Sequence, residues 1–321
     1  MVDNLIVGSG NFKFKVIQNW EKLPAGFSWR ETAAVIADIE DNIYVFNRGN
    51  HPVIIFDRFG NYKSSWGENV FTRPHGLTLG PDETIFCADD GDHTIRKCTL
   101  DGRILMTLGN VGKASLYQSG NPFHRPTDIA FDPITDDIYV SDGYGNSKVH
   151  KYSADGRLLF SWGQPGTDPG QFNIVHNIAT DKDGYVYVAD RENHRVQIFD
   201  RNGKYETQWN NLHRPCALYI SKDQLVYVGE LGSGLSVNRN MPNIGPRITI
   251  LNTKGVKLTT LGSSGWGLNP GQFIAPHGIA VDSQENLYLS EVSWTNLKSL
   301  GCEQNNVRSF QKLERIPTQI V

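Results

Sequence analysis

Three histidines occupy matching positions in three copies of one repeat, and they are the first sign of chemistry in this 321-residue chain. They are His75 in FTRPHGLTL, His176 in FNIVHNIAT and His277 in FIAPHGIAV, each after an aromatic residue and before an apolar run. In a circular repeat fold, equivalent positions of different copies point toward one shared axis. Three neutral imidazoles that meet there can bind Zn²⁺ and leave a fourth coordination position open. The spacing therefore predicts a central zinc site.

The elements that carry these histidines belong to six related units. Each unit contains a short apolar run, a strand of alternating β-branched and aromatic residues such as Tyr185–Ala189, a third strand such as Arg195–Phe199, and an outer strand. The outer strand ends in Trp-Gly or Leu-Gly at 66–67, 108–109, 162–163 and 261–262. Asp-Gly or Asn-Gly pairs at 101–102, 155–156 and 202–203 predict tight turns into the outer strand. Four-stranded units repeated about every 40–50 residues predict an all-β fold, a six-bladed β-propeller.

The predicted propeller forms a single domain, 1–321. We expect the strand Phe12–Gln18 to complete the last blade, because pairing the two ends of the chain removes an exposed sheet edge. The segment 232–246 is rich in Gly, Asn and Pro, and we interpret it as a surface insertion that either covers one face or is merely tolerated. The predicted blades span 27–68, 71–110, 123–164, 172–211, 212–263 and 273–316, the last together with 12–18.

Composition excludes several functional classes. The net charge of −3 and the pI of about 6.3 provide no basic surface for nucleic acid. No apolar run reaches the roughly 18 residues of a membrane span, and the first residues lack the basic and apolar regions of a secretory leader. The four cysteines show no CxxC spacing. We therefore expect a cytoplasmic monomer that binds neither nucleic acid nor membrane.

The repeats resemble those of NHL-type propellers, and longer motifs resemble peptidyl-α-hydroxyglycine α-amidating lyases, the lyase domain of peptidylglycine α-amidating enzymes. The resemblance runs from about Phe46 to Trp294, and the strings DGYGNS and ADRENHRVQ are its most specific parts. It implies a lyase that cleaves an N–C(OH) carbinolamide into an amide and glyoxylate. The implied partner is a small molecule or the C-terminus of a peptide.

The resemblance also implies an active site with three zinc ligands, a catalytic tyrosine and two arginines. In this chain they are His75, His176, His277, Tyr144, Arg48 and Arg191. The chemistry agrees with such a set, because cleavage requires a base for the hydroxyl proton and a cation beside the oxygen that becomes a carbonyl. A tyrosine can be the base, and an arginine can hold the substrate carboxylate through two hydrogen bonds.

The chain departs from this family at several positions. Gly278 stands where the family has an aspartate that helps to hold a structural calcium. The sequence therefore leaves open whether this chain binds Ca²⁺ as a second cofactor. The family's two disulfides are missing, with His124 and Gly145 at one pair of positions and Tyr187 and Ile198 at the other. Their loss agrees with a reducing cytoplasm.

Further residues are expected around the site. Asp128 is expected behind the zinc ligands, where a carboxylate can orient a histidine. His51 and His194 follow the candidate arginines and are expected to line the pocket. Asp142 and Asp190 end inner strands and are expected to form turn hydrogen bonds.

Each candidate also has a structural explanation. The three histidines could hydrogen-bond around a central water channel, and Tyr144 could pack beside Gly143. The arginines could form ion pairs, Arg48 with Asp57 or Glu68 and Arg191 with Asp190 or Glu192.

Two other functions compete with the lyase. One is a non-catalytic NHL propeller that binds a protein, and the other is a metal-dependent hydrolase of lactones or esters.

Overall fold

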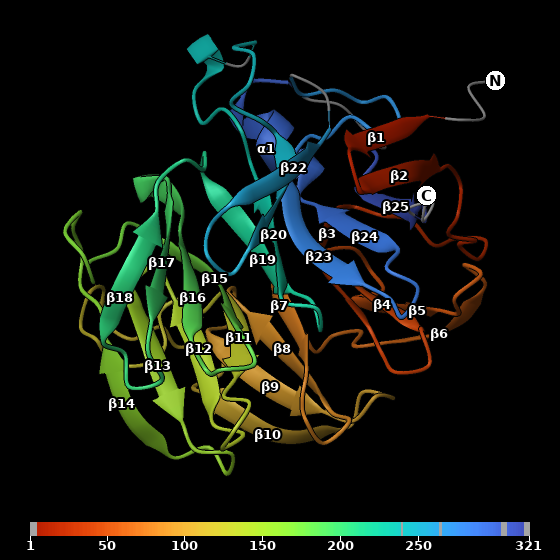
Figure 1. Cartoon of the computed structure of the whole chain (residues 1–321). Helices are drawn as coiled ribbons and strands as arrows, with labels where there is room; N and C mark the ends of the chain where they lie inside the picture. The colour runs from red at the N-terminus through yellow and green to blue at the C-terminus, as the bar shows by residue number, and fades with distance from the viewer. Residues whose placement is uncertain (1–4, 239, 263–264, 303–306, 318–321) are drawn as a thin grey trace. The chain divides into compact units, whose positions relative to one another are not determined.

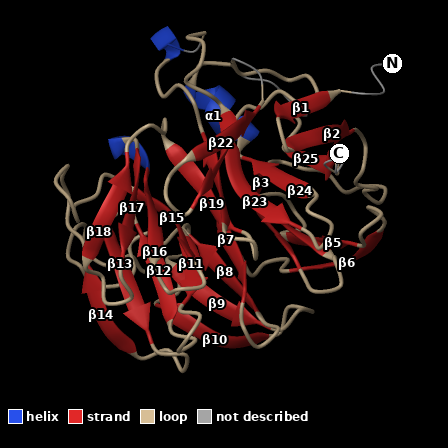
Figure 2. Ribbon diagram, viewed as in Figure 1, coloured by secondary structure: helices blue, strands red, loops and turns tan. Residues whose placement is uncertain are grey.

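The computed structural model of the chain describes residues 5–238, 240–262, 265–302 and 307–317. Strands make up most of its regular structure (Figure 2). Its helical elements are α1 (Ser293–Ser299) and two 3-10 turns, η1 (Arg191–Asn193) and η2 (Ser236–Asn238). No helix in the described ranges is long and apolar enough to cross a membrane.

The strands form six antiparallel sheets, five of which contain four strands that follow one another along the chain (Figure 1). This is a six-bladed β-propeller arrangement, which confirms the predicted fold class. The first sheet contains β3 (Thr32–Ala37), β4 (Ile43–Asn47), β5 (Val53–Phe56) and β6 (Tyr62–Trp66). The second sheet contains β7 (Pro74–Leu79), β8 (Ile85–Asp89), β9 (Thr94–Cys98) and β10 (Ile104–Gly109). The third sheet contains β11 (Asp128–Phe131), β12 (Ile138–Asp142), β13 (Lys148–Tyr152) and β14 (Leu158–Trp162). The fourth sheet contains β15 (Val175–Thr180), β16 (Val186–Asp190), β17 (Arg195–Phe199) and β18 (Tyr205–Trp209). The fifth contains β19 (Pro215–Ile220), β20 (Leu225–Glu230), β21 (Arg247–Asn252) and β22 (Lys257–Leu261).

The sixth sheet joins the two ends of the chain. It contains β23 (Pro276–Val281), β24 (Leu287–Glu291) and β25 (Phe310–Arg315), followed by β2 (Phe12–Ile17) and β1 (Ile6–Ser9). β2 pairs antiparallel with β25, with Val16 opposite Leu313, and β1 pairs with β2 on its other side (Figure 1). The expected N-terminal closing strand is therefore confirmed, and β1 is an additional strand that the repeat pattern did not predict.

By their internal contacts the residues form two compact units, which are described separately below. One unit is Trp66–Gln224, and the other combines the chain up to Ser65 with the chain from Leu225 onward. The first unit contains His75, Tyr144 and His176. The second contains Arg48 and His277.

Burial explains why the strands differ in composition. The second strand of a blade, such as β16, is buried at every position, and its residues are apolar up to the aspartate that ends it. The outer strand β14 has its first residues exposed. Between the third and fourth sheets, Tyr139, Phe172 and Val188 belong to one apolar cluster. Burial of such residues contributes roughly 1.5–3 kcal/mol per large side chain.

The Trp-Gly and Asp-Gly signatures are two parts of one contact. Gly203 has φ +78°, and a Cβ there would come within 2.8 Å of the Trp162 ring. Gly102 has φ +94°, and a Cβ there would come within 2.6 Å of the Trp66 ring. Glycine is required at these turns because it adopts positive φ and leaves room for the tryptophan that ends the preceding outer strand.

A buried carboxylate at the end of the second strand holds the entry to the first strand. Asp190 Oδ1 accepts a hydrogen bond from the backbone N–H of Asn173 (2.7 Å), and Asp142 Oδ1 accepts one from His124 N (3.0 Å). Glu291 Oε1 accepts from the backbone N–H of Ile274 (2.6 Å). The turn hydrogen bonds expected for Asp142 and Asp190 are present. They fix the backbone three residues before the histidine position of the repeat.

Candidate metal centre

Each of the three histidines is the second residue of the first strand of its sheet: His75 in β7, His176 in β15 and His277 in β23. Each is buried, and each Nδ1 lies beside a backbone carbonyl oxygen. The distances are 2.7 Å from His75 to Thr127 O, 3.0 Å from His176 to Cys216 O and 2.6 Å from His277 to Ala33 O. Because a carbonyl only accepts hydrogen bonds, Nδ1 carries the proton and Nε2 keeps its lone pair for a metal ion.

The accepting carbonyls come from the same repeat position in other blades. Ala33, Thr127 and Cys216 stand where the other three units have histidine, so histidine and a small residue alternate from one unit to the next. The short motifs RPT and RPC beside RPH and APH carry this signal in the sequence. The prediction from sequence did not extend to the alternation or to its role in orienting the imidazoles.

The nitrogen atoms of this set lie close together. One ligand nitrogen from each of His75, His176 and His277 lies within 4.8 Å of the other two, so the triad could bind a metal ion. Within the unit Trp66–Gln224, the ring centroids of His75 and His176 are 4.8 Å apart.

Tyr144 is directed at the same two histidines. Its hydroxyl oxygen lies 3.2 Å from His75 Nε2 and 3.3 Å from His176 Nε2. The residue follows β12, and Gly143 allows its loop to approach β15, since a Cβ on Gly143 would lie 1.7 Å from the carbonyl oxygen of Val175. The hydroxyl oxygen of Tyr144 therefore lies close to the Nε2 atoms of both imidazoles.

Two guanidinium groups lie against this tyrosine. Arg191 Nη1 donates to the Tyr144 hydroxyl oxygen (3.4 Å), and its guanidinium carbon lies 5.5 Å from the centre of the ring. The Arg125 guanidinium lies 4.4 Å from the same ring centre and pairs with Asp90 (2.6 Å). The sequence analysis selected Arg191 but missed Arg125. The RP motif that Arg125 shares with Arg73 and with residue 214 could have pointed to it.

Arg191 is held by an ion-pair network. Its Nε donates to Glu192 Oε1 (2.7 Å), and Arg214 donates to the same oxygen (2.9 Å). Burial works to raise the pKa of Glu192, but the hydrogen bonds and charges of the two arginines outweigh it and lower that pKa to about 2. Burial works to lower the pKa of Arg191, but attraction by Tyr144, Cys216 and Glu192 outweighs it. Arg191 thus takes part in both the ion pair with Glu192 and the contact with Tyr144.

His176 is surrounded by groups that keep its ring neutral and oriented. Burial, with a contribution from the charge of Arg191, lowers the pKa of His176 to about 3. Asn177 Oδ1 lies 2.7 Å from His176 Nδ1, and Asn177 Nδ2 donates to Asp128 (2.8 Å). Asp128 is therefore connected to the candidate zinc ligand His176 through the side chain of Asn177.

In the other unit, Arg48 Nη1 donates to Glu31 Oε1 at 2.8 Å. Glu31 also accepts hydrogen bonds from the backbone N–H and the hydroxyl of Thr295, at 2.7 and 2.6 Å. His51 stacks on Phe27, with ring centroids 3.6 Å apart. Arg48 is thus a buried, oriented cation in the described part of this unit.

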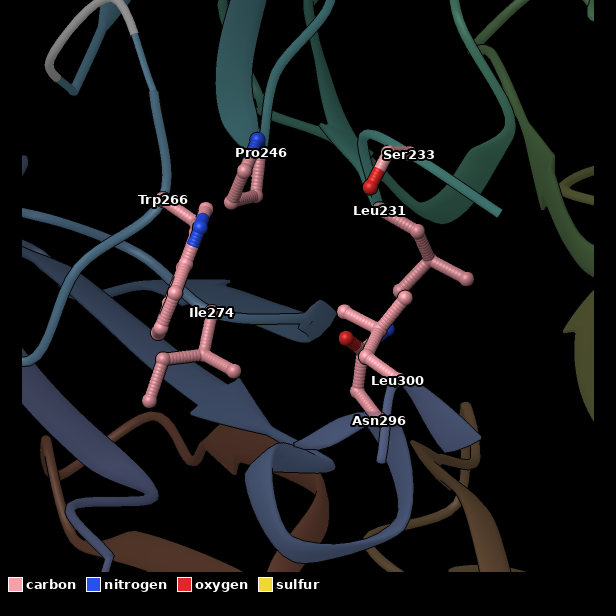
Figure 3. A pocket seen from close by; sticks show the side chains of 7 residues that line it. All are labelled: Leu231, Ser233, Pro246, Trp266, Ile274, Asn296 and Leu300. Atoms are coloured by element: carbon pink, nitrogen blue, oxygen red, sulfur yellow. The ribbon is translucent and has the colours of Figure 1, made fainter. Parts of the chain in front are cut away.

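Among the cavities of the described residues, two are relevant to the predicted site. A groove of about 590 Å³ in the unit Trp66–Gln224 includes Tyr144 in its wall. A smaller pocket of about 220 Å³ in the other unit is lined mainly by apolar residues, and it contains none of the predicted site residues (Figure 3). The residues around this second pocket are Leu231, Ser233, Pro246, Trp266, Ile274, Asn296 and Leu300.

The family profile described as NHL repeat matches residues 172–199, the segment that contains His176 and Arg191. The chain is a β-propeller that carries an NHL repeat. It is 30% identical over 210 residues to NHL repeat-containing protein 3 of Homo sapiens, covering 62% of this chain and 60% of that protein. It is also 30% identical over 256 residues to peptidyl-alpha-hydroxyglycine alpha-amidating lyase 1 of Drosophila melanogaster, covering 73% of this chain and 45% of the lyase.

This propeller therefore spans between 45% and 60% of the length of these two curated relatives. Among solved structures, a gluconolactonase from Xanthomonas campestris matches with a TM-score of 0.60 and 9% identity, covering 98% of this chain and 91% of that one. At 9% sequence identity, this structural similarity shows a shared fold and nothing more.

Proposed function

We propose that this NHL-repeat propeller is a zinc-dependent lyase that cleaves the N–C(OH) bond of a carbinolamide such as a peptidyl-α-hydroxyglycine. The products are an amide and glyoxylate. The observation that carries the proposal is the Tyr144 hydroxyl oxygen, which lies 3.2 and 3.3 Å from Nε2 of His75 and His176. Similarity to the fly protein named as an amidating lyase supports the substrate class.

The histidine set fits zinc. All three Nδ1 atoms are used by backbone carbonyls, so three neutral Nε2 donors are available, as a three-histidine catalytic zinc requires. Histidine nitrogens favour zinc over calcium, which binds oxygen ligands. When bound, Zn²⁺ would polarise the substrate hydroxyl and lower its pKa.

The side chains then perform the proton transfers. In its deprotonated form, the tyrosinate, Tyr144 accepts the proton of the substrate hydroxyl, and the C–O bond becomes a carbonyl as the C–N bond breaks. The electron pair of that bond moves to nitrogen, to which Tyr144 returns the proton, giving the amide. Arg191 and Arg125 stabilise negative charge on the tyrosine oxygen, because both guanidinium groups lie against its ring.

Arg48 is the proposed partner of the substrate carboxylate. A planar guanidinium can form two parallel hydrogen bonds to a carboxylate. Glu31 and Thr295 restrict the Arg48 side chain, which lowers the entropy cost of binding. In this scheme Arg48 orients the substrate and takes no part in the proton transfers.

The test combines metal content with turnover. Purified wild-type protein is expected to contain near-stoichiometric zinc by plasma mass spectrometry, and His176→Ala to contain almost none. His51→Ala is the matched control and should keep the metal. Tyr144→Phe should also keep the metal but release glyoxylate from an N-acyl-α-hydroxyglycine about 10²–10⁴ times more slowly, the usual effect of losing a general base. Full activity in Tyr144→Phe would refute the assignment of the base.

The second candidate is a binding propeller without catalytic activity. Its support is the match to NHL repeat-containing protein 3, which is as similar in sequence as the named lyase and whose name states no activity. Wild-type protein without metal, or equal metal in His176→Ala and wild type, would favour this candidate over the lyase.

A further inference from the structure

The groove beside Tyr144 has the features of a binding site for a neutral polar ligand. Three loop segments form it, around residues 117–118, 143–147 and 165–174. Its lining residues are Tyr117, Gln118, Gly143, Tyr144, Ser147, Pro165, Gly166, Thr167, Phe172, Asn173 and Ile174. In this described lining no side chain is an acid, a lysine or an arginine, so the groove is unsuited to a carboxylate or phosphate.

Hydrogen bonds fix the walls of this groove. Gln118 N donates to Gly145 O (2.8 Å), which joins the first loop to the loop that carries Tyr144. On the opposite wall, Gly166 N donates to Phe172 O (3.1 Å), and Asn193 Nδ2 donates to Gly166 O (2.8 Å). Such a preformed groove loses little conformational entropy when a ligand binds.

One buried acceptor in the wall has no partner. Gln118 Nε2 donates to Ser147 Oγ (3.4 Å), whereas Gln118 Oε1 is buried and accepts no hydrogen bond from any described residue. The backbone of Gln118 also adopts φ +56°, a left-handed conformation that is uncommon for residues with a Cβ. A buried acceptor without a donor costs free energy, and a ligand that supplies an N–H or O–H removes that cost.

We propose that this groove binds the peptide on the nitrogen side of the scissile bond, and that Gln118 accepts the backbone N–H of the residue before the hydroxyglycine. The inference rests on the proposed function and deepens it by naming the groove and a specificity-determining residue, Gln118. The carboxylate end of the substrate requires a cation, which the groove lacks. The groove therefore suits the amide end, where the groups to be recognised are uncharged N–H and C=O.

The test measures binding of product-like amides to the zinc-loaded 321-residue chain, so it needs no turnover. The probes are N-acetyl-phenylalaninamide and O-acetyl-3-phenyllactamide, which differ only in having N–H or an ester oxygen at the position proposed to face Gln118. Wild type should bind the N–H probe about three- to tenfold more tightly, the usual effect of one hydrogen bond. Gln118→Met should bind both probes with similar, weaker affinity.

Two further variants separate this role from a structural one. Gln118→Glu keeps an acceptor oxygen and should keep the preference for the N–H probe. Gln224→Met, in the turn between β19 and β20, should behave as wild type. The inference would be overturned if wild type bound the two probes equally or bound neither of them. It would also be overturned if Gln118→Met kept the preference for the N–H probe. If the preference is present but no glyoxylate is ever released, the lyase proposal fails while the groove assignment stands.

Discussion

At the scale of single residues, hydrogen bonds to the backbone decide what the histidines can do. A carbonyl at each Nδ1 selects one tautomer and leaves Nε2 for a metal ion. Behind His176, the amide of Asn177 connects the imidazole to the buried carboxyl group of Asp128. Burial raises the pKa of Asp128 to about 7 from its ordinary 3.8. Hence Asp128 is protonated in the folded protein at mildly acidic pH.

This shift predicts a pH-dependent effect of Asp128→Asn. Between about pH 4 and pH 7 the unfolded chain ionises Asp128 while the folded chain keeps it protonated, so wild-type stability falls as pH rises through this window. Asparagine does not titrate and keeps an acceptor for Asn177. The melting temperature of Asp128→Asn minus that of wild type should therefore be larger at pH 8 than at pH 4.5. A difference that is constant across pH would show that Asp128 is ionised in the fold.

At the scale of elements, close packing between neighbouring loops and strands sets the position of the tyrosine. Gly143 lies against the carbonyl of Val175, the first residue of β15. That contact brings Tyr144, which follows Gly143, to His176, which follows Val175. The carboxylate of Asp190 fixes the entry to β15 from the other side of the loop by accepting from Asn173 N.

We expect Gly143→Ala to disturb both the fold and the site. Its Cβ would lie 1.7 Å from a backbone oxygen, so the loop or β15 must move. Overpacking of this kind costs roughly 1–3 kcal/mol, which urea denaturation measures. Glyoxylate release should fall as well. The control is Gly265→Ala, where an added Cβ would meet nothing within 4 Å, and its stability should change by less than about 0.5 kcal/mol. Equal stability of the two variants would contradict this account.

At the scale of the whole molecule, the N-terminal strands complete the sixth sheet. β2 covers the edge of β25, and Phe14 and Val16 on β2 are buried. Without β2, the unpaired N–H and C=O groups of β25 would form an exposed edge that can pair with another chain.

A chain that begins at Asn19 should therefore melt at lower temperature and associate as its concentration rises. Loss of the buried Phe14 alone would cost about 3–5 kcal/mol, the usual value for a phenylalanine removed from a core. Calorimetry and light scattering measure the two effects. Asn11→Ala, an exposed change in the β1–β2 turn, is the control. An unchanged melting temperature of the shortened chain would show that β2 is dispensable for closure.

The repeat pattern was sufficient to predict the propeller and its closing strand. Inner and outer strands differ in how deeply they are buried and therefore in composition, and the turns into the outer strands recur with a glycine at the same place. The pattern was also sufficient to select His75, His176 and His277, since one register places equivalent residues at equivalent points of the fold. These inferences depend on local periodicity, which is readable without any knowledge of contacts.

Only the tertiary structure revealed the groups that complete the site. Arg125 reaches Tyr144 from another loop, and Cys216 and Thr127 supply carbonyls from neighbouring sheets. The unpartnered oxygen of Gln118 likewise depends on which loops meet. Backbone carbonyls have no sequence signature, and contacts between loops depend on how the sheets pack. For this reason the sequence selected the three candidate histidines, whereas the structure showed which nitrogen of each ring is hydrogen-bonded to the backbone and which loops form the groove beside Tyr144.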